Sequence, residues 1–156
     1  MKLTYFLTMV LGTSITLTSC IANEPKQPNE SKKTTQTTDF DQFKGSVVTL
    51  NQLAQKFNSP DEAFSAAIQS DSVVVDFYAE WCGPCQQMGS YLPAVASKFP
   101  NVLFIKVNIE KFPTITNQYG IRSIPTIIFF KKGSLVKRNV GLLSERALSD
   151  LVSTTF

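Results

Sequence analysis

Two cysteines, Cys82 and Cys85, stand two residues apart beside Trp81 in the stretch WCGPC. Thiols at this spacing can exchange electrons with a disulfide, supply half of a metal site, or pack in a core. A structural zinc site takes four ligands, and the chain has no histidine and only one further cysteine, Cys20. Covalent haem attachment uses a histidine directly after the second cysteine, where Gln86 stands. The composition therefore favours a redox pair, and we expect no metal and no cofactor.

The pair is predicted to lie where a strand gives way to a helix. Residues 72–79 form an apolar run with β-branched and aromatic side chains, typical of a buried strand. Residues 83–99 carry apolar side chains at helical spacing. A helix N-terminus offers free N–H groups and partial positive charge, which favour the thiolate, and only the thiolate attacks a disulfide. We expect Cys82 to be the nucleophile and Cys85, one turn later and more buried, to be the resolving thiol.

The remaining patterns predict an α/β fold with a mixed sheet and helices on both faces. Further strands are expected at 101–109, 126–130 and 134–141, the last at an edge after a Lys132-Gly133 hairpin turn. Helices are expected from Ser59-Pro60 to Ile68 and over 144–152. The first strand stays ambiguous, because residues 47–50 or 55–57 could form it.

Two longer stretches, VVVDFYAEWCGPC and YGIRSIPTIIFFKKG, together resemble the thioredoxin family, and the resemblance runs from about Asp61 to Val152. It implies the thioredoxin fold and thiol–disulfide exchange. It also implies that Asp76, in the strand before the cysteines, helps to deprotonate Cys85. A buried carboxyl has a raised pKa, which suits proton exchange near neutral pH. Lys106 occupies the matching position in the next strand, where it can pair with Asp76.

The same resemblance assigns residues to substrate binding. It implies that Pro125 follows a cis bond and faces the disulfide, and that the backbone of Ile124 pairs with an extended substrate segment. Trp81 is expected to give an apolar contact surface, and Gly141 to be a small residue in the groove. Between the cysteines, Gly83 is expected to permit a tight turn and Pro84 to lack an N–H that a helix start leaves unsatisfied.

Two positions depart from the family pattern. Tyr78 stands where many thioredoxins have a tryptophan. Many members also kink the helix with a proline five residues after the second cysteine, but here that position is Ser90 and the proline is Pro93. An interior proline bends a helix, so we expect the bend nearly a turn later.

The first twenty residues are typical of an export signal, with Lys2, an apolar stretch and then small residues. Leu-Thr-Ser-Cys at 17–20 resembles the bacterial lipobox, which implies cleavage before Cys20 and acylation of that cysteine. We predict a signal peptide at 1–19, a lipidated Cys20 with a disordered tether at 20–38, and a thioredoxin-like domain at 39–156. Ile21 after the cysteine favours the outer membrane over the inner, if the cell is Gram-negative.

These observations predict an exported, membrane-tethered thiol–disulfide oxidoreductase that reduces protein disulfides with electrons from a membrane thiol relay. An oxidase or isomerase of the periplasm stays open as an alternative, as does a non-catalytic module that uses the groove to hold a partner. The net charge is +3 and no Lys/Arg run exceeds two residues, so we expect no nucleic-acid partner. We also expect a monomer, since nothing in the sequence marks an exposed apolar face.

Overall fold

The computed structural model describes residues 40–156. The predicted signal peptide, the predicted tether and Cys20 all lie outside the described residues. Our boundary of the folded domain, residue 39, lies one residue before the described part begins.

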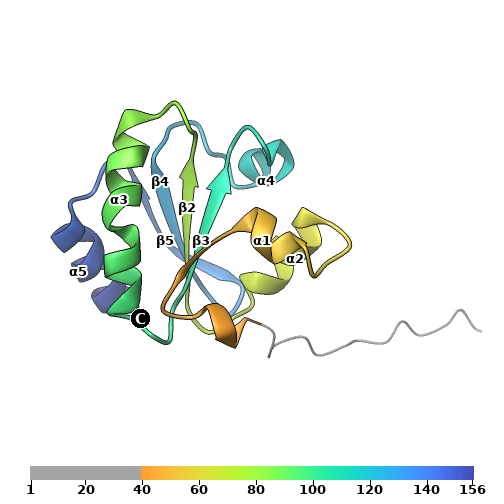
Figure 1. Cartoon of the computed structure of the whole chain (residues 1–156), viewed down its shortest axis with the longest axis horizontal. Coiled ribbons are helices and arrows are strands. Elements are labelled where there is room, and N and C mark those ends of the chain that lie inside the picture. The colour runs from red at the N-terminus through yellow and green to blue at the C-terminus, as the bar shows by residue number, and fades with distance from the viewer. Residues whose placement is uncertain (1–39) are drawn as a thin grey trace, which may run out of the picture. The chain divides into compact units, whose positions relative to one another are not determined.

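Within residues 40–156, five strands form one mixed sheet in the order β1–β3–β2–β4–β5. The first three are parallel neighbours, whereas β4 runs antiparallel to β2, and β5 antiparallel to β4. β2, the strand before the cysteines, is the centre of the sheet (Figure 1). The strands are β1 (Val47–Thr49), β2 (Val73–Tyr78), β3 (Leu103–Asn108), β4 (Thr126–Lys131) and β5 (Ser134–Val140).

Helices cover both faces of the sheet, as predicted. α3 (Gly83–Ser97) and α5 (Glu145–Thr155) lie on one side, and α1 (Leu50–Ala54), α2 (Pro60–Ala67) and α4 (Pro113–Gln118) lie on the other (Figure 1). A short 3-10 turn, Asp41–Phe43, precedes β1. The α/β class and the mixed sheet between two helical layers are confirmed.

Alternation along β2 divides the interior into two clusters. Val73, Val75 and Phe77 belong to the cluster under α1, α2 and α4, whereas Val74 belongs to the cluster under α3 and α5. Successive strand residues point to opposite faces, so Asp76 and Tyr78 share the α3 side with Val74. This alternation places a carboxyl inside the sheet face that α3 covers.

The expected elements are found with small shifts at their ends. The ambiguity over the first strand is resolved in favour of Val47–Thr49, and the alternative at 55–57 is not a strand but follows α1. Ser59 and Ser144 cap α2 and α5, each accepting a hydrogen bond from a backbone N–H. Lys132 and Gly133 both have positive φ, as a two-residue hairpin turn requires.

Two short helices were not predicted. α1 begins at Leu50, directly after its N-cap Thr49, which forms a capping box with Gln52. α4 has no side-chain cap, and its sequence PTITNQ contains β-branched residues that favour helix poorly. It is held by burial of Ile115 and Thr116 and by a hydrogen bond from Arg138 Nη2 to the Tyr119 carbonyl, 2.5 Å long. Tertiary contacts, which a sequence pattern does not reveal, fix this helix.

Candidate active site

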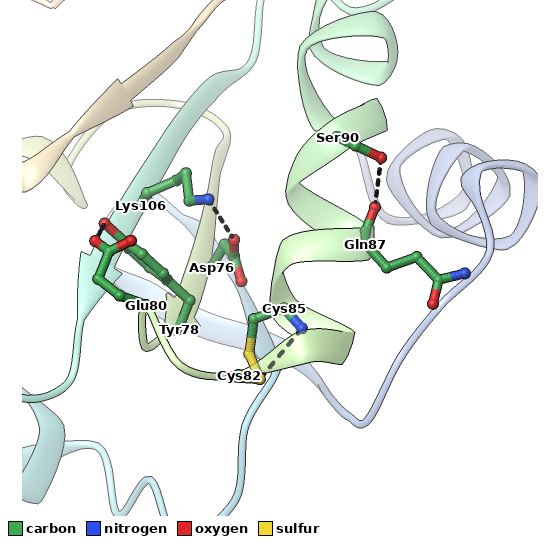
Figure 2. Close-up of polar contacts among 8 residues, drawn as sticks. All are labelled: Asp76, Tyr78, Glu80, Cys82, Cys85, Gln87, Ser90 and Lys106. Carbon is green, nitrogen blue, oxygen red and sulfur yellow. Dashed lines mark hydrogen bonds and ion pairs between the residues drawn. A yellow bond between two sulfur atoms is a disulfide. The ribbon is translucent and has the colours of Figure 1, made fainter.

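The two cysteines lie at the start of α3, directly after the end of β2. Cys82 is the N-cap of the helix, and its Sγ accepts a hydrogen bond from the Cys85 N–H at 3.2 Å. The two sulfurs form a disulfide 2.03 Å long (Figure 2). Cys82 is 5% exposed and Cys85 1% exposed, so the predicted order of burial is confirmed. An N–H group of the helix start, that of Cys85, is thus directed at the sulfur that we expect to react.

The two residues between the cysteines differ in how they meet our expectations. Pro84 lies in the first turn of α3, as predicted. Gly83 does not have a positive φ, so the expected need for a glycine in a tight turn is not found. A Cβ at Gly83 would meet no heavy atom within 4 Å. The surface beside Cys82 is therefore open.

Asp76 lies on the α3 side of β2 and is 1% exposed. Neither of its carboxyl oxygens has a hydrogen-bond partner among the described residues. Burial raises the pKa of Asp76 from 3.8 to about 7, although the nearby charge of Lys106 acts to lower it. This carboxyl can therefore hold or release a proton near neutral pH.

Lys106 is the direct neighbour of Asp76 across the β2–β3 pairing. Its Nζ lies 3.8 Å from Asp76 Oδ2, an ion-pair distance that is too long for a hydrogen bond. The same Nζ lies 4.2 Å from the centre of the Tyr78 ring (Figure 2). The predicted pairing of Lys106 with Asp76 is confirmed, and Tyr78 joins it.

A pocket of about 400 Å³ lies beside the cysteines. Its lining combines Trp81, at the active-site stretch, with residues after β3 and before β4: Ile109, Ile121, Arg122, Ser123 and Ile124. Trp81 is 68% exposed, and its indole N–H donates to Glu110 Oε1 at 3.0 Å. An exposed aromatic face next to a disulfide offers an apolar contact to an approaching chain.

The loop before β4 has the predicted geometry. The bond between Ile124 and Pro125 is cis. Ile124 packs against the cluster formed by Ala79 and the two cysteines. Gly141 has φ +98 and donates its N–H to the Pro125 carbonyl at 2.8 Å. The loop with Ile124 and Pro125 thus lies beside the disulfide, and Gly141 is hydrogen-bonded to that loop.

Comparison with known proteins agrees with this geometry. The Thioredoxin family model matches residues 55–154. Thioredoxin from Chlamydia trachomatis serovar D is 45% identical over 92 residues, which cover 59% of this chain and 90% of the relative. Thioredoxin from Rickettsia felis is 38% identical over 99 residues, which cover 62% of this chain and 94% of the relative.

Solved structures show the same fold. A mutant thioredoxin from Halobacterium salinarum NRC-1 superimposes with a TM-score of 0.59 at 29% identity, covering 72% of this chain and 92% of that one. Plasmodium falciparum thioredoxin gives a TM-score of 0.59 at 28% identity, covering 71% and 99%. The chain belongs to the thioredoxin family. It is a thiol–disulfide oxidoreductase.

Sequence reasoning missed several residues of this thioredoxin site. Glu110, which holds Trp81, is one, and Ile109, Ile121, Arg122 and Ser123 in the pocket are the others. A usable signal existed for the first two. Because β2 and β3 are parallel, their carboxyl ends meet at one edge of the sheet, so residues 109–110 had to lie beside residues 79–82.

Among the residues that the structure describes, no group of three or more His, Cys, Asp or Glu side chains could hold a metal ion. In the same part of the chain, no helix is long and apolar enough to cross a membrane.

The raised pKa of Asp76 predicts a pH-dependent cost to stability. The folded state holds this proton up to about pH 7, whereas the unfolded state loses it near 3.8, so stability falls as pH rises through this window. At about 1.36 kcal/mol per pKa unit, the loss between pH 4 and pH 8 is roughly 4 kcal/mol. Asp76→Asn carries no charge and should escape this loss.

The measurement is urea unfolding of the oxidised protein and of the oxidised Asp76→Asn variant at pH 4 and pH 8. The free energy of unfolding of the variant minus that of the wild type should be about 4 kcal/mol larger at pH 8 than at pH 4. Other titrating groups cancel because both proteins carry them. A difference that is the same at both pH values would show that Asp76 is already ionised at low pH in the folded protein.

Proposed function

We propose that this thioredoxin-family protein is an exported, membrane-tethered reductase of protein disulfides. The observation that carries the reductase chemistry is the Cys82–Cys85 pair at the start of α3, on the face of the sheet that holds the buried Asp76. One sulfur is presented at a helix N-terminus, and a proton acceptor lies within the same layer. The roles below follow from this arrangement.

The first step is attack on the substrate by the Cys82 thiolate of the reduced protein. A bond forms between Cys82 Sγ and one substrate sulfur, and the substrate S–S bond breaks. The other substrate sulfur leaves with the electron pair and takes a proton. The N–H groups at the start of α3 stabilise the Cys82 thiolate before attack, and the open surface at Gly83 gives the substrate access.

The second step frees the product. Cys85 gives its proton to the Asp76 carboxylate, and the resulting thiolate attacks Cys82 Sγ. The Cys82–Cys85 bond forms while the bond to the substrate breaks, and the substrate sulfur leaves as a thiolate that water protonates. Asp76 suits this role because its pKa, about 7, allows both protonation states at neutral pH.

Substrate binding is assigned to the pocket and the loop before Pro125. Trp81 and Ile124 both line the pocket and provide apolar contact there. The backbone of Ile124 is offered to an extended substrate segment as a hydrogen-bonding partner. Gly141, hydrogen-bonded to Pro125, holds the end of β5 against this loop without adding a side chain.

The direction of electron flow is proposed to be reduction. Gly-Pro between the cysteines resembles reducing thioredoxins, and the relatives found by comparison are named thioredoxin. An exported space is kept oxidising, so the protein would be reduced again by a thiol relay in the membrane. An oxidase or isomerase, or a binding module without catalysis, are the competing functions.

Variants of the two cysteines test for catalysis. With Cys85→Ala, the second step is blocked, and Cys82 should accumulate as a mixed disulfide with a substrate such as insulin. With Cys82→Ala, no such adduct should form, because Cys85 is the more buried sulfur. Both variants carry Cys20→Ser in the full chain, so that one thiol remains, and adducts are read by non-reducing electrophoresis and mass spectrometry. A binding module would give equal, minor adducts with either variant.

Export and tethering rest on the lipobox-like 17–20 and on the polar stretch that follows it. A flexible chain of eighteen residues has a root-mean-square span of roughly 25 Å, enough to hold the domain clear of lipid. The proposed location is the periplasmic side of a membrane, with the outer membrane favoured in a Gram-negative cell. Several acyl chains at Cys20 would anchor the protein firmly.

Metabolic labelling tests the anchor. In a bacterial host, the protein should incorporate labelled palmitate, and globomycin should cause the uncleaved precursor to accumulate. Cys20→Ser should abolish both effects, whereas Ser19→Ala, which keeps a small residue before the cysteine, should preserve them. Absence of label on the wild-type protein, with no globomycin-sensitive precursor, would contradict lipidation.

A further inference from the structure

The ammonium group of Lys106, which extends from β3, has close neighbours on β2 and α3. Asp76 Oδ2 of β2 lies 3.8 Å from Nζ, and the centre of the Tyr78 ring, also on β2, lies 4.2 Å away. From α3, Gly89 approaches so closely that a Cβ on it would lie 3.0 Å from Nζ. Three groups thus define the position of the Lys106 ammonium: the Asp76 carboxyl, the Tyr78 ring and the backbone at Gly89, which has no side chain.

Gly89 is not explained by its own backbone. It lies inside a fifteen-residue helix and is not among the glycines with positive φ. Glycine weakens the interior of a helix relative to alanine, so a reason must come from its surroundings. The nearest atom that an added Cβ would meet is Lys106 Nζ, and no other heavy atom outside the helix lies within 4 Å. The room left by the missing side chain is occupied by the ammonium.

Pro93 offers a competing explanation. Proline has no N–H and crowds the carbonyl four residues earlier, which here is the carbonyl of Gly89. A glycine at this position would therefore reduce crowding by Pro93 and would have no connection with Lys106. The experiment below separates the two reasons.

Tyr78 supplies the second wall. The face of an aromatic ring attracts a cation within about 6 Å of its centre. The Tyr78 hydroxyl donates to Glu80 Oε1 at 3.2 Å, which fixes the orientation of the ring (Figure 2). The ring therefore holds the ammonium on the side of β2 where Asp76 lies.

We propose that Gly89 and Tyr78 are positioning residues that hold the Lys106 ammonium beside Asp76, and that they thereby control how readily Asp76 takes the proton of Cys85. The role in proton transfer rests on the proposed function, whereas the placement of the Lys106 ammonium by Gly89 and Tyr78 does not. Gly89 acts by leaving space, and Tyr78 acts through the face of its ring. Displacing the ammonium leaves the buried carboxylate without its counter-charge, so Asp76 should keep its proton to higher pH.

The groups around Asp76 are few and come from known elements. Lys106 of β3 is the cation that acts on it, and Tyr78 of β2 and Tyr91 of α3 are neutral at physiological pH, since burial raises the pKa of both. β4 places the apolar Ile127 beside it. Beyond these neighbours, Glu80 acts on Tyr78 and Glu145 acts on Tyr91. In the reduced protein, the thiols of Cys82 and Cys85 at the start of α3 are also titratable.

The test is the titration midpoint of the Asp76 carboxyl carbon, followed by NMR in the oxidised full chain carrying Cys20→Ser. Gly89→Ala should raise the midpoint by about half a pH unit or more, because the new methyl group pushes Nζ away from Asp76. Folding should be preserved, since alanine favours a helix and only the end of a flexible side chain must move. Ser90→Ala, the next residue on the exposed side of the same helix, should leave the midpoint unchanged.

A double-mutant cycle decides between Lys106 and Pro93 as the reason for Gly89. In a Lys106→Met background, Gly89→Ala should no longer move the midpoint. If Gly89→Ala shifts the Asp76 midpoint equally with and without Lys106, Gly89 acts through Pro93 and the proposal is wrong. If it shifts the midpoint in neither background, the proposal is also wrong.

Two Tyr78 variants test the ring independently. Tyr78→Phe keeps the aromatic face and should leave the midpoint nearly unchanged, whereas Tyr78→Leu removes the face and should raise it. Equal effects of the two variants would refute the role of the ring. These midpoints are measured in the absence of substrate. They therefore test the placement of the ammonium independently of whether the protein reduces disulfides. In the variants that raise the Asp76 midpoint, the pH profile of insulin reduction, measured in parallel, should shift to higher pH.

Discussion

The structure depends on a carboxyl that is buried with no hydrogen-bond partner among residues 40–156. Asp76 lies in the central strand, under α3, where burial raises its pKa to about 7. A fixed charge there would be costly, and a permanently neutral side chain could not move a proton. With a pKa of about 7, Asp76 is neither permanently charged nor permanently neutral near neutral pH. Among the described residues, Lys106, itself partly exposed, is the cation that offsets this cost, so the position of its ammonium decides how much charge the interior tolerates.

Sheet topology brings the other parts of the site to the same place. The parallel β2 and β3 end at one edge, which unites the cysteines and Trp81 with Glu110. The antiparallel β4 begins at that edge, so the loop with Pro125 arrives there too. Reactive sulfur, apolar contact and the extended loop therefore meet without a separate domain to hold them. Thioredoxin-type exchange needs this convergence, because a substrate disulfide must reach Cys82 while its chain lies across the neighbouring loop.

The sequence allowed the central strands, the long helices and the cysteine pair to be predicted, because each has a strong local pattern. β2 has a continuous apolar run, and α3 has a proline in its first turn shortly after the strand. α4 could not be predicted, because it is weakly helical and is held by the core around Ile115. Gly83 was wrongly given a conformational reason. The role of Gly89 could not be predicted, because it depends on contact with Lys106. That contact arises only when α3 packs on the sheet.

Electron flow through Cys82 and Cys85 decides whether this thioredoxin-family protein reduces or oxidises its substrates. The most direct measurement is the reduction potential of the pair, obtained by equilibrating the full chain carrying Cys20→Ser with glutathione buffers and counting free thiols by mass spectrometry. A reductase fed by a membrane thiol relay should have a potential near that of thioredoxin, about −270 mV. A potential near that of a strong oxidant, about −120 mV, would contradict the account and make the protein a donor of disulfides.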